Sequence, residues 1–403
     1  MLQGNQAPIA THKDGFWTIF FTFLKLGLTA FGGPIAHIGY FRQEFVERKS
    51  WLDETAFSQL LAICQFIPGP ASSQLGFAIG LMRAGWLGAI AAFTAFTLPS
   101  AIILIAFGSA LPFLSGDLFN ASIHGLKLVA CAVVADAVWG MSKNLCTDIQ
   151  RRGIALAAMS ALLIFDISWL QIALIVFGAF AGMVLCKSAV NQGANTIKIN
   201  YGKGTSLILL LVFTALLLVL VFAPIQSGLW QVAEIFYRAG ALVFGGGHVV
   251  LPLLEQSIVA NGLVSEAHFL AGYGASQAIP GPMFTFAAYL GVIIPTGFSP
   301  WLGAIVALLF MFLPGFLLLA AALPVWQSMA QKPKMAQAIA GINATVVGIL
   351  AAALVDPILS SSISSLIDIV IALIALAMLT VWRLSPLWLV LWCVTASAMM
   401  TLL

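Results

Sequence analysis

Charged residues are scarce in this sequence, and their scarcity excludes a soluble protein. Only 8% of the 403 residues are charged and 61% are hydrophobic, whereas soluble domains average about 25% charged and about 45–50% apolar residues. Helices satisfy their own backbone hydrogen bonds in lipid. We therefore expect an all-α polytopic membrane protein whose surroundings are the lipid bilayer. The net charge of +3 is too small to indicate binding to nucleic acid.

Cysteine is also rare, and its spacing excludes two classes of site. The five cysteines include no Cys-x-x-Cys pair, and most lie in apolar runs where Cys behaves as a small hydrophobe. Neither a metal site nor a disulfide framework is expected, and no cofactor is indicated. No His, Asp and Glu residues group at ligand spacing, which argues against an enzyme.

What the sequence does contain is a long internal repeat. Residues 25–34 match residues 238–247 at a shift of 213, each with a cation six positions before Phe-Gly-Gly. Residues 65–70 and 277–282 share the pattern Gln-x-Ile-Pro-Gly-Pro at a shift of 212. Ordered matches at a near-constant shift predict a duplication.

The duplication predicts four segments. They are a cytoplasmic N-terminus at 1–15, a first transporter repeat at 16–187, a linker at 188–227 with one extra transmembrane helix at about 205–223, and a second transporter repeat at 228–403. The polar N-terminus leads into the first helix without a small-residue cleavage site. We therefore expect no removable signal peptide.

The positions of the cations predict that the two repeats face opposite ways. Lys and Arg concentrate on the cytoplasmic side of membrane proteins. With the N-terminus inside, 14 of the 17 lie on the inner side and none in an outer loop. The other three, Lys25, Lys127 and Arg238, fall within helices. The extra crossing at 205–223 turns the second repeat upside down and leaves the C-terminus periplasmic. Inverted-topology repeats are the architecture of many secondary transporters.

Each repeat also contains helices too short to cross a bilayer. Segment 16–31 would span about 24 Å, and segments 53–66 and 70–83 still less, against a hydrocarbon core of about 30 Å. Broken backbone at that depth is tolerated only where protein buries it or where it lines a cavity. Four half-helix N-termini would then meet in one volume, each with roughly half a positive charge and free N–H donors. Such a volume would favour a compact dianion.

The candidate substrate-binding residues lie at these breaks. A cation inside a membrane is a functional hypothesis by default, although Lys25 has the alternative of snorkelling to the cytoplasmic surface. Gln65 and Gln277 either donate to an oxyanion or cap their own half-helices. The full set is Lys25, Gly32, Gly33, Gln65, Gly69, Pro70, Ser72, Arg238, Gly245, Gly246, Gly247, Gln277, Gly281, Pro282 and Thr285.

Four further residues are candidates for proton coupling. Two histidines lie just past the breaks, and histidine changes charge near neutral pH; a structural role is the alternative. The four are His37, Asp136, Glu234 and His248. His124 and Lys127 share one face of the segment 118–141 by their spacing, without an assigned role.

At these motifs the sequence resembles the chromate ion transporter family in its long two-domain form. The matching pieces are Phe-Gly-Gly-Pro-x-Ala-His at 31–37, Gly-Pro-x-x-x-Gln-x-Gly-Phe-x-x-Gly at 69–80, Gly-x-x-Gly-Ala at 85–89, Leu-Pro-Ser at 98–100 and Phe-Gly-Gly-Gly-His at 244–248. The resemblance implies an inner-membrane protein that exports chromate and gives chromate resistance, with sulfate as a structural analogue. It also implies two homologous halves of opposite orientation.

The expected mechanism is alternating access, driven by the membrane potential, by proton exchange or by both. The alternatives are a permease for sulfate or another oxyanion, and an anion channel. A channel predicts a continuous polar pore, whereas the predicted outer loops and long helices are almost wholly apolar. The oligomeric state is open, and a homodimer is one option.

Overall fold

The computed structural model describes residues 15–165, 167, 169–186, 199, 201–223, 227–244, 247–326 and 332–402. Every regular element within these ranges is a helix, which confirms the all-α expectation. Five helical stretches are long and apolar enough to cross a membrane. They are Ala71–Phe113, Asp117–Leu145, Lys203–Phe222, Pro300–Val325 and Pro333–Ser362.

The two halves contain similar successions of helices, although the second is divided into more and shorter elements. The first half comprises α1 (Phe16–Thr29), α2 (Gly33–Arg42), η1 (Gln43–Arg48), α3 (Glu54–Phe66), α4 (Ala71–Ala110), η2 (Leu111–Phe113), α5 (Asp117–Leu145), α6 (Ile149–Ile164) and α7 (Leu170–Leu185). The second comprises α9 (Gly228–Leu242), η3 (Gly247–Val249), α10 (Val250–Ile258), α11 (Glu266–Gln277), η4 (Met283–Thr285), α12 (Phe286–Ile293), α13 (Pro300–Ala322), η5 (Leu323–Val325), α15 (Pro333–Ala353), η6 (Leu354–Leu359), α16 (Ser360–Ser362), α17 (Leu366–Thr380) and α18 (Pro386–Leu402). The single helix α8 (Lys203–Phe222) lies between them.

The short helices of the first half break at glycines, close to where the sequence predicts. Between α1 and α2, Gly32 has a φ of 96°, which glycine adopts without strain. Within α4, Gly85 has a φ of 64° and separates a short segment, 71–83, from a long one. Pro34 lies in the first turn of α2, where a missing backbone N–H costs nothing. Pro70 and Pro282 stand one residue earlier, at the N-cap of α4 and η4.

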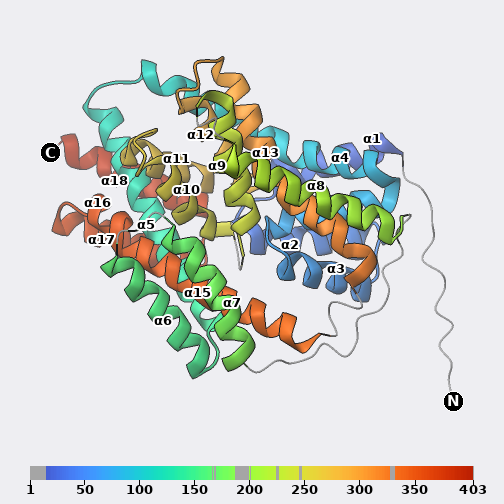
Figure 1. Ribbon diagram of the computed structural model, residues 1–403. Coiled ribbons are helices and arrows are strands. Elements are labelled where there is room, and N and C mark those ends of the chain that lie inside the picture. Colours follow the sequence, from blue (N-terminus) through green and yellow to red (C-terminus); the bar gives the residue numbers. More distant parts are fainter. Residues whose placement is uncertain are drawn as a thin grey trace.

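The halves are interlocked because they exchange their outer helices. α5 packs against α17 and α18 of the second half, and α15 packs against α6 and α7 of the first. In Figure 1, α6, α7, α15 and α17 accordingly lie together on one side of the molecule, while α1, α4, α8 and α13 lie on the other. A Cβ added at Gly341 of α15 would collide with the carbonyl oxygen of Gly178 of α7. This close backbone approach is typical of helix packing in membranes.

Polar contacts join α5 to α16 and to the first turn of α17. The imidazole of His124 lies 2.8 Å from a carboxylate oxygen of Asp368, and the Lys127 ammonium donates to the carbonyl of Ser361. Asp368 also accepts from the backbone N–H of Ser364 and Ser365. The shared face of His124 and Lys127 therefore binds the first half to the second.

We expect Gly341→Ala to lower the melting temperature of the purified protein in detergent. Its added methyl must push apart two helices from different halves, and overpacking of this kind costs about 1–3 kcal/mol. Gly140→Ala in α5 is the matched control, because nothing lies within 4 Å of a Cβ built there. Equal melting temperatures for the two variants would contradict the close approach of α7 and α15.

Candidate anion-binding site

The broken helices of the two halves are joined by two matching backbone hydrogen bonds. Gly69 N–H donates to the carbonyl of Val243, at the end of α9, over 2.7 Å. Gly281 N–H donates to the carbonyl of Ala30, at the end of α1, over 2.9 Å. Gly69 and Gly281 are equivalent in the repeat, and so are Ala30 and Val243. Each Pro-Gly-Pro turn therefore binds the helix break of the opposite half.

A second contact relates the breaks in the same way. A Cβ added at Gly247 would lie 3.1 Å from Cγ of Pro34. These two positions are also equivalent in the repeat, and equivalent residues touch each other where they lie close to an axis of two-fold pseudosymmetry. Gly245 and Gly246, the other predicted residues of this break, lie outside the described residues.

The glycines of the Pro-Gly-Pro turns are required by conformation and by space. Gly69 has a φ of 128° and Gly281 a φ of 100°, values that L side chains rarely adopt. A Cβ at Gly69 would lie 2.9 Å from Cα of Gly315, and one at Gly281 would lie 2.8 Å from Oγ of Ser100. Each turn therefore packs tightly against the long helix of the opposite half.

The half-helices begin without side-chain caps. α2, α4 and η4 have no side chain that accepts from their first N–H groups. Several other helices, among them α5, α8 and α13, also lack a side-chain cap. By comparison, α3, α6, α11 and α17 are each capped by one side chain: Asp53, Asp148, Ser265 and Ser365. The first N–H groups of a helix have no partner within it. The uncapped starts therefore retain donors that can bind an anion.

His37 is buried and connects the first break to the start of α4. Its Nε2 lies 3.2 Å from the Ala30 carbonyl, and its Nδ1 lies 3.4 Å from Oγ of Ser72. A carbonyl can only accept, so Nε2 carries a proton, and in the neutral ring Nδ1 accepts from the Ser72 hydroxyl. The structure thus brings together two predicted residues, with the histidine holding the break in shape.

Two buried polar atoms at the start of α4 have no partner among the described residues. They are the hydroxyl of Ser73 and the side-chain oxygen of Gln74. The Gln74 amide nitrogen donates to the carbonyls of Pro68 and Gly315, both over 2.9 Å. Gln74 therefore links the halves, and the Ser73 hydroxyl remains available as a donor.

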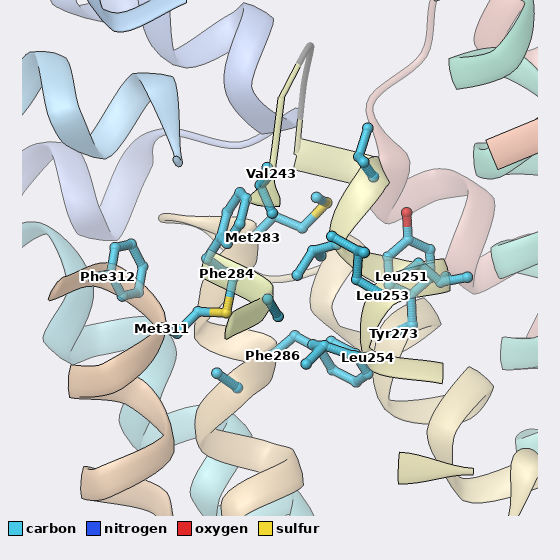
Figure 2. Close-up of a cluster of buried hydrophobic side chains, with 14 of the residues drawn as sticks. Val243, Leu251, Leu253, Leu254, Tyr273, Met283, Phe284, Phe286, Met311 and Phe312 are labelled. Atoms are coloured by element: carbon cyan, nitrogen blue, oxygen red, sulfur yellow. The ribbon is translucent and has the colours of Figure 1, made fainter. Parts of the chain in front are cut away.

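The second-half turn is enclosed by apolar side chains. Figure 2 shows Val243, Met283, Phe284 and Phe312 around the end of α9, and all four are buried. Thr285, a predicted ligand, is also buried, but its hydroxyl donates to the Pro282 carbonyl over 2.6 Å. Thr285 therefore stabilises its own turn.

The two Pro-Gly-Pro turns differ in exposure. Gln65 is exposed and Gly69 half-buried in the first half, whereas Gln277 and Gly281 of the second are buried. The Gln277 amide donates to the carbonyl of Tyr273 and to the hydroxyl of Ser276, both on its own helix. Of the two roles open to this glutamine, the capping one is observed, while Gln65 faces away from the interior.

The two repeat-equivalent cations also have different surroundings. Lys25 lies on the exposed face of α1 with Trp17, Phe21 and Leu28, and it forms no ion pair with any residue that the structure describes. Arg238 is two-thirds buried, with 33% of its side chain exposed. The equivalence of the two positions in sequence therefore does not extend to their contacts.

Arg238 lies in a polar pocket of about 410 Å³ between α8, α9 and α10. Its Nη1 pairs with Oε1 of Glu234 over 3.0 Å, and its Nη2 donates to the Ser257 hydroxyl over 3.0 Å. Asn261 and Gln231 also line the pocket. Glu234, a predicted proton-coupling residue, therefore forms an ion pair with Arg238, a predicted substrate-binding residue.

The other two proton-coupling candidates lie apart from this pocket. Nδ1 of His248 lies 2.6 Å from the hydroxyl of the buried Tyr273. Asp136 is half-buried in α5 and has no hydrogen bond or ion pair with the described part of the chain. The structure therefore groups Glu234 with Arg238, and His37 with Ser72, but does not join these pairs to Asp136.

Sequence reasoning missed three polar residues of the pocket. Ser257 and Asn261 lie four residues apart, on one face of the segment that follows the second break. That spacing was a usable signal. Gln231 precedes Glu234 by three residues and Arg238 by seven, which is the spacing of one helix face, so the sequence held a signal for it too.

Among the described residues no group of three or more His, Cys, Asp or Glu side chains is arranged to hold a metal ion. All five cysteines are buried and unpaired. The chemistry available at this site is therefore the binding of charge by a guanidinium, hydroxyls, amides and free backbone N–H groups.

This chain is similar in sequence to known transport proteins. A family model described as chromate transporter matches residues 17–183 and again residues 230–398. A probable chromate transport protein of Synechococcus elongatus is 30% identical, over 90% of this chain and 88% of that protein. Chromate transport proteins of Pseudomonas aeruginosa and Cupriavidus metallidurans are 27% and 26% identical, over 84% and 88% of this chain and 80% and 84% of theirs. No solved structure matches.

The family match confirms the resemblance seen in the motifs and covers both halves of the chain. It also accounts for the duplicated succession of helices, since each half matches the same family model. The protein is a multi-pass membrane protein by its apolar helices. The chain belongs to the chromate transporter family, a family of membrane transporters rather than of enzymes.

Proposed function

We propose that the protein exports chromate across the inner membrane by alternating access between two inverted repeats, and so gives chromate resistance. The family and the names of its relatives support chromate as the substrate. The observation that carries the mechanism is the reciprocal pair of hydrogen bonds from Gly69 and Gly281 to the opposite breaks. A substrate site at the interface of two repeats is the usual arrangement in secondary transporters.

The oxyanion binds, in this proposal, where the half-helices begin. Free N–H groups and the positive end of the helix dipole favour an anion at the uncapped starts of α2, α4 and η4. The Ser73 hydroxyl adds a donor. Arg238 supplies a positive charge at a second place, the polar pocket between α8, α9 and α10, which none of these helix starts lines; Lys25 does not line this pocket either.

We infer export from the resemblance to the chromate transporter family. With the N-terminus in the cytoplasm, chromate then enters from the cytoplasmic side. The single helix α8 between the halves supports their inversion. Sulfate, with the same tetrahedral shape and charge, is the second candidate substrate.

We expect efflux of chromate from proteoliposomes to accelerate when the interior is made negative. Moving one charge through 100 mV is worth about 2.3 kcal/mol, so a dianion gains about twice that amount. The measurement is chromium released from loaded vesicles under a potassium diffusion potential, with protein-free vesicles as the control. A flux that is rapid and does not saturate with chromate would identify a channel instead, and the absence of flux would overturn the proposed function.

Arg238→Gln should weaken chromate binding to the purified protein at least about tenfold, because hydrogen bonds to a charged group contribute about 1.5–3 kcal/mol. Lys25→Gln is the comparison variant, since its side chain lies on an exposed face with apolar neighbours. It should bind chromate within about twofold of wild type. An equal loss of chromate affinity in both variants would show that Lys25 also contributes to binding. Wild-type affinity in Arg238→Gln would show that Arg238 does not bind chromate.

A further inference from the structure

We propose that the pocket around Arg238 binds an oxyanion, and that the carboxylate of Glu234 competes with that oxyanion for the Arg238 guanidinium. When the oxyanion binds, it displaces Glu234 from Arg238, and Glu234 then binds one proton. The inference rests on the proposed function for the class of ligand, a tetrahedral oxyanion. It adds the ligand set, the competitor and the proton that accompanies binding.

The geometry of Arg238 makes Glu234 a replaceable ligand. One amino group of the guanidinium pairs with the Glu234 carboxylate and the other donates to Ser257. The Ser257 hydroxyl in turn donates to the Leu253 carbonyl over 2.9 Å. Ser257 is therefore fixed by its own helix and positions the guanidinium. The Glu234 carboxylate accepts from Nη1 of Arg238, the nitrogen that would otherwise donate to an oxygen of the oxyanion. Arginine suits such an exchange because its fork binds carboxylates and tetrahedral oxyanions alike.

The charges around the pocket make this competition unavoidable. Glu234 and Arg238 are the only charged residues among the described ones that line it. Of the helices packed against α9, α13 has no charged residue, α8 has only Lys203 at its opposite end, and α10 has Glu255, which does not line the pocket. A dianion placed beside an ionised Glu234 would therefore face an uncompensated negative charge. Protonation of the carboxyl group removes that repulsion.

The pocket also has room and access for the exchange. Its volume of about 410 Å³ exceeds what a five-atom oxyanion needs, so water can accompany the ion. Glu234 keeps 19% and Arg238 33% of the side chain exposed, so neither is sealed inside the protein. Gln231 and Asn261 contribute amide groups that can donate to the oxygens of the ion.

The first half has a cation, Lys25, at the position equivalent to Arg238, but it lacks the carboxylate that pairs with Arg238 and the wall that α8 forms beside it. Phe21 stands where Glu234 would be in the repeat, so Lys25 has no carboxylate one turn before it. The wall formed by Leu220, Val221 and Ala223 comes from α8 and its C-terminal end, which belongs to neither half. The proton-linked site is therefore single, although the chain is duplicated.

The proposed step balances without any further reactant. At the start Glu234 is ionised and paired with Arg238. An oxyanion dianion forms hydrogen bonds to the guanidinium, the bond between Glu234 and Arg238 breaks, and Glu234 takes one proton from the adjoining solution. On departure of the anion Glu234 releases that proton and pairs with Arg238 again. Binding of the oxyanion and binding of the proton therefore favour each other.

The test is calorimetric titration of the purified full-length protein with sulfate, which stays a dianion between pH 6 and pH 8 while chromate does not. Wild-type affinity should rise by up to about tenfold for each unit by which the pH falls, as expected for one linked proton. Titrations in buffers of different ionisation enthalpy should show uptake of about one proton per sulfate. Glu234→Gln should bind tightly at both pH values and take up no proton.

Glu255→Gln is the matched control, because Glu255 lies two residues from Ser257 but outside the pocket. It should retain the pH dependence of wild type, and a normal elution profile of Glu234→Gln in gel filtration verifies its fold. An unchanged pH dependence in Glu234→Gln, or no binding of sulfate at either pH, would overturn this inference. Chromate efflux from proteoliposomes tests the proposed function separately, since it requires only that the wild type transports.

Discussion

A backbone that breaks inside a membrane has to satisfy its polar groups without water, and in this protein each half satisfies the breaks of the other. The carbonyls of Ala30 and Val243, left open where α1 and α9 end, accept from Gly281 and Gly69 of the opposite Pro-Gly-Pro turns. An unsatisfied group at such a depth costs several kcal/mol. The interrupted helices are therefore stabilised by contacts between the two halves. The exchange of outer helices around α5 and α15 reinforces the same dependence.

This mutual dependence explains why glycine and small residues occupy the contact points. Gly69 packs on Gly315, Gly281 packs on Ser100, and Gly247 touches Pro34. Side chains at these positions would separate the turns from the breaks that they satisfy. The same turns leave the first N–H groups of three half-helices without a side-chain cap. One arrangement thus both stabilises the breaks and presents donors to an anion.

Duplication produced the frame, and local differences made its two halves chemically unequal. Lys25 and Arg238 derive from equivalent positions, yet α8 covers only the second, where Glu234 and Ser257 also converge. Gln65 is exposed and Gln277 is bonded to its own helix. The two equivalent positions therefore offer an anion different surroundings.

The sequence by itself determined the helical class, the repeat, the places where helices break and the family, since these depend on composition, spacing and glycine or proline at particular positions. It also marked Arg238, Glu234, His37 and Ser72 as candidates. The spacing of four residues already favours the pairing of Glu234 with Arg238 on one helix, whereas only the tertiary structure decided which residues of other helices meet them. Lys25 and Arg238 have equivalent contexts in sequence, but burial and charge pairing depend on which helix packs against each face, and residues far apart in the chain supply those neighbours. The pocket at Arg238 exists because α8 and α10 fold onto α9, and no local pattern encodes that packing.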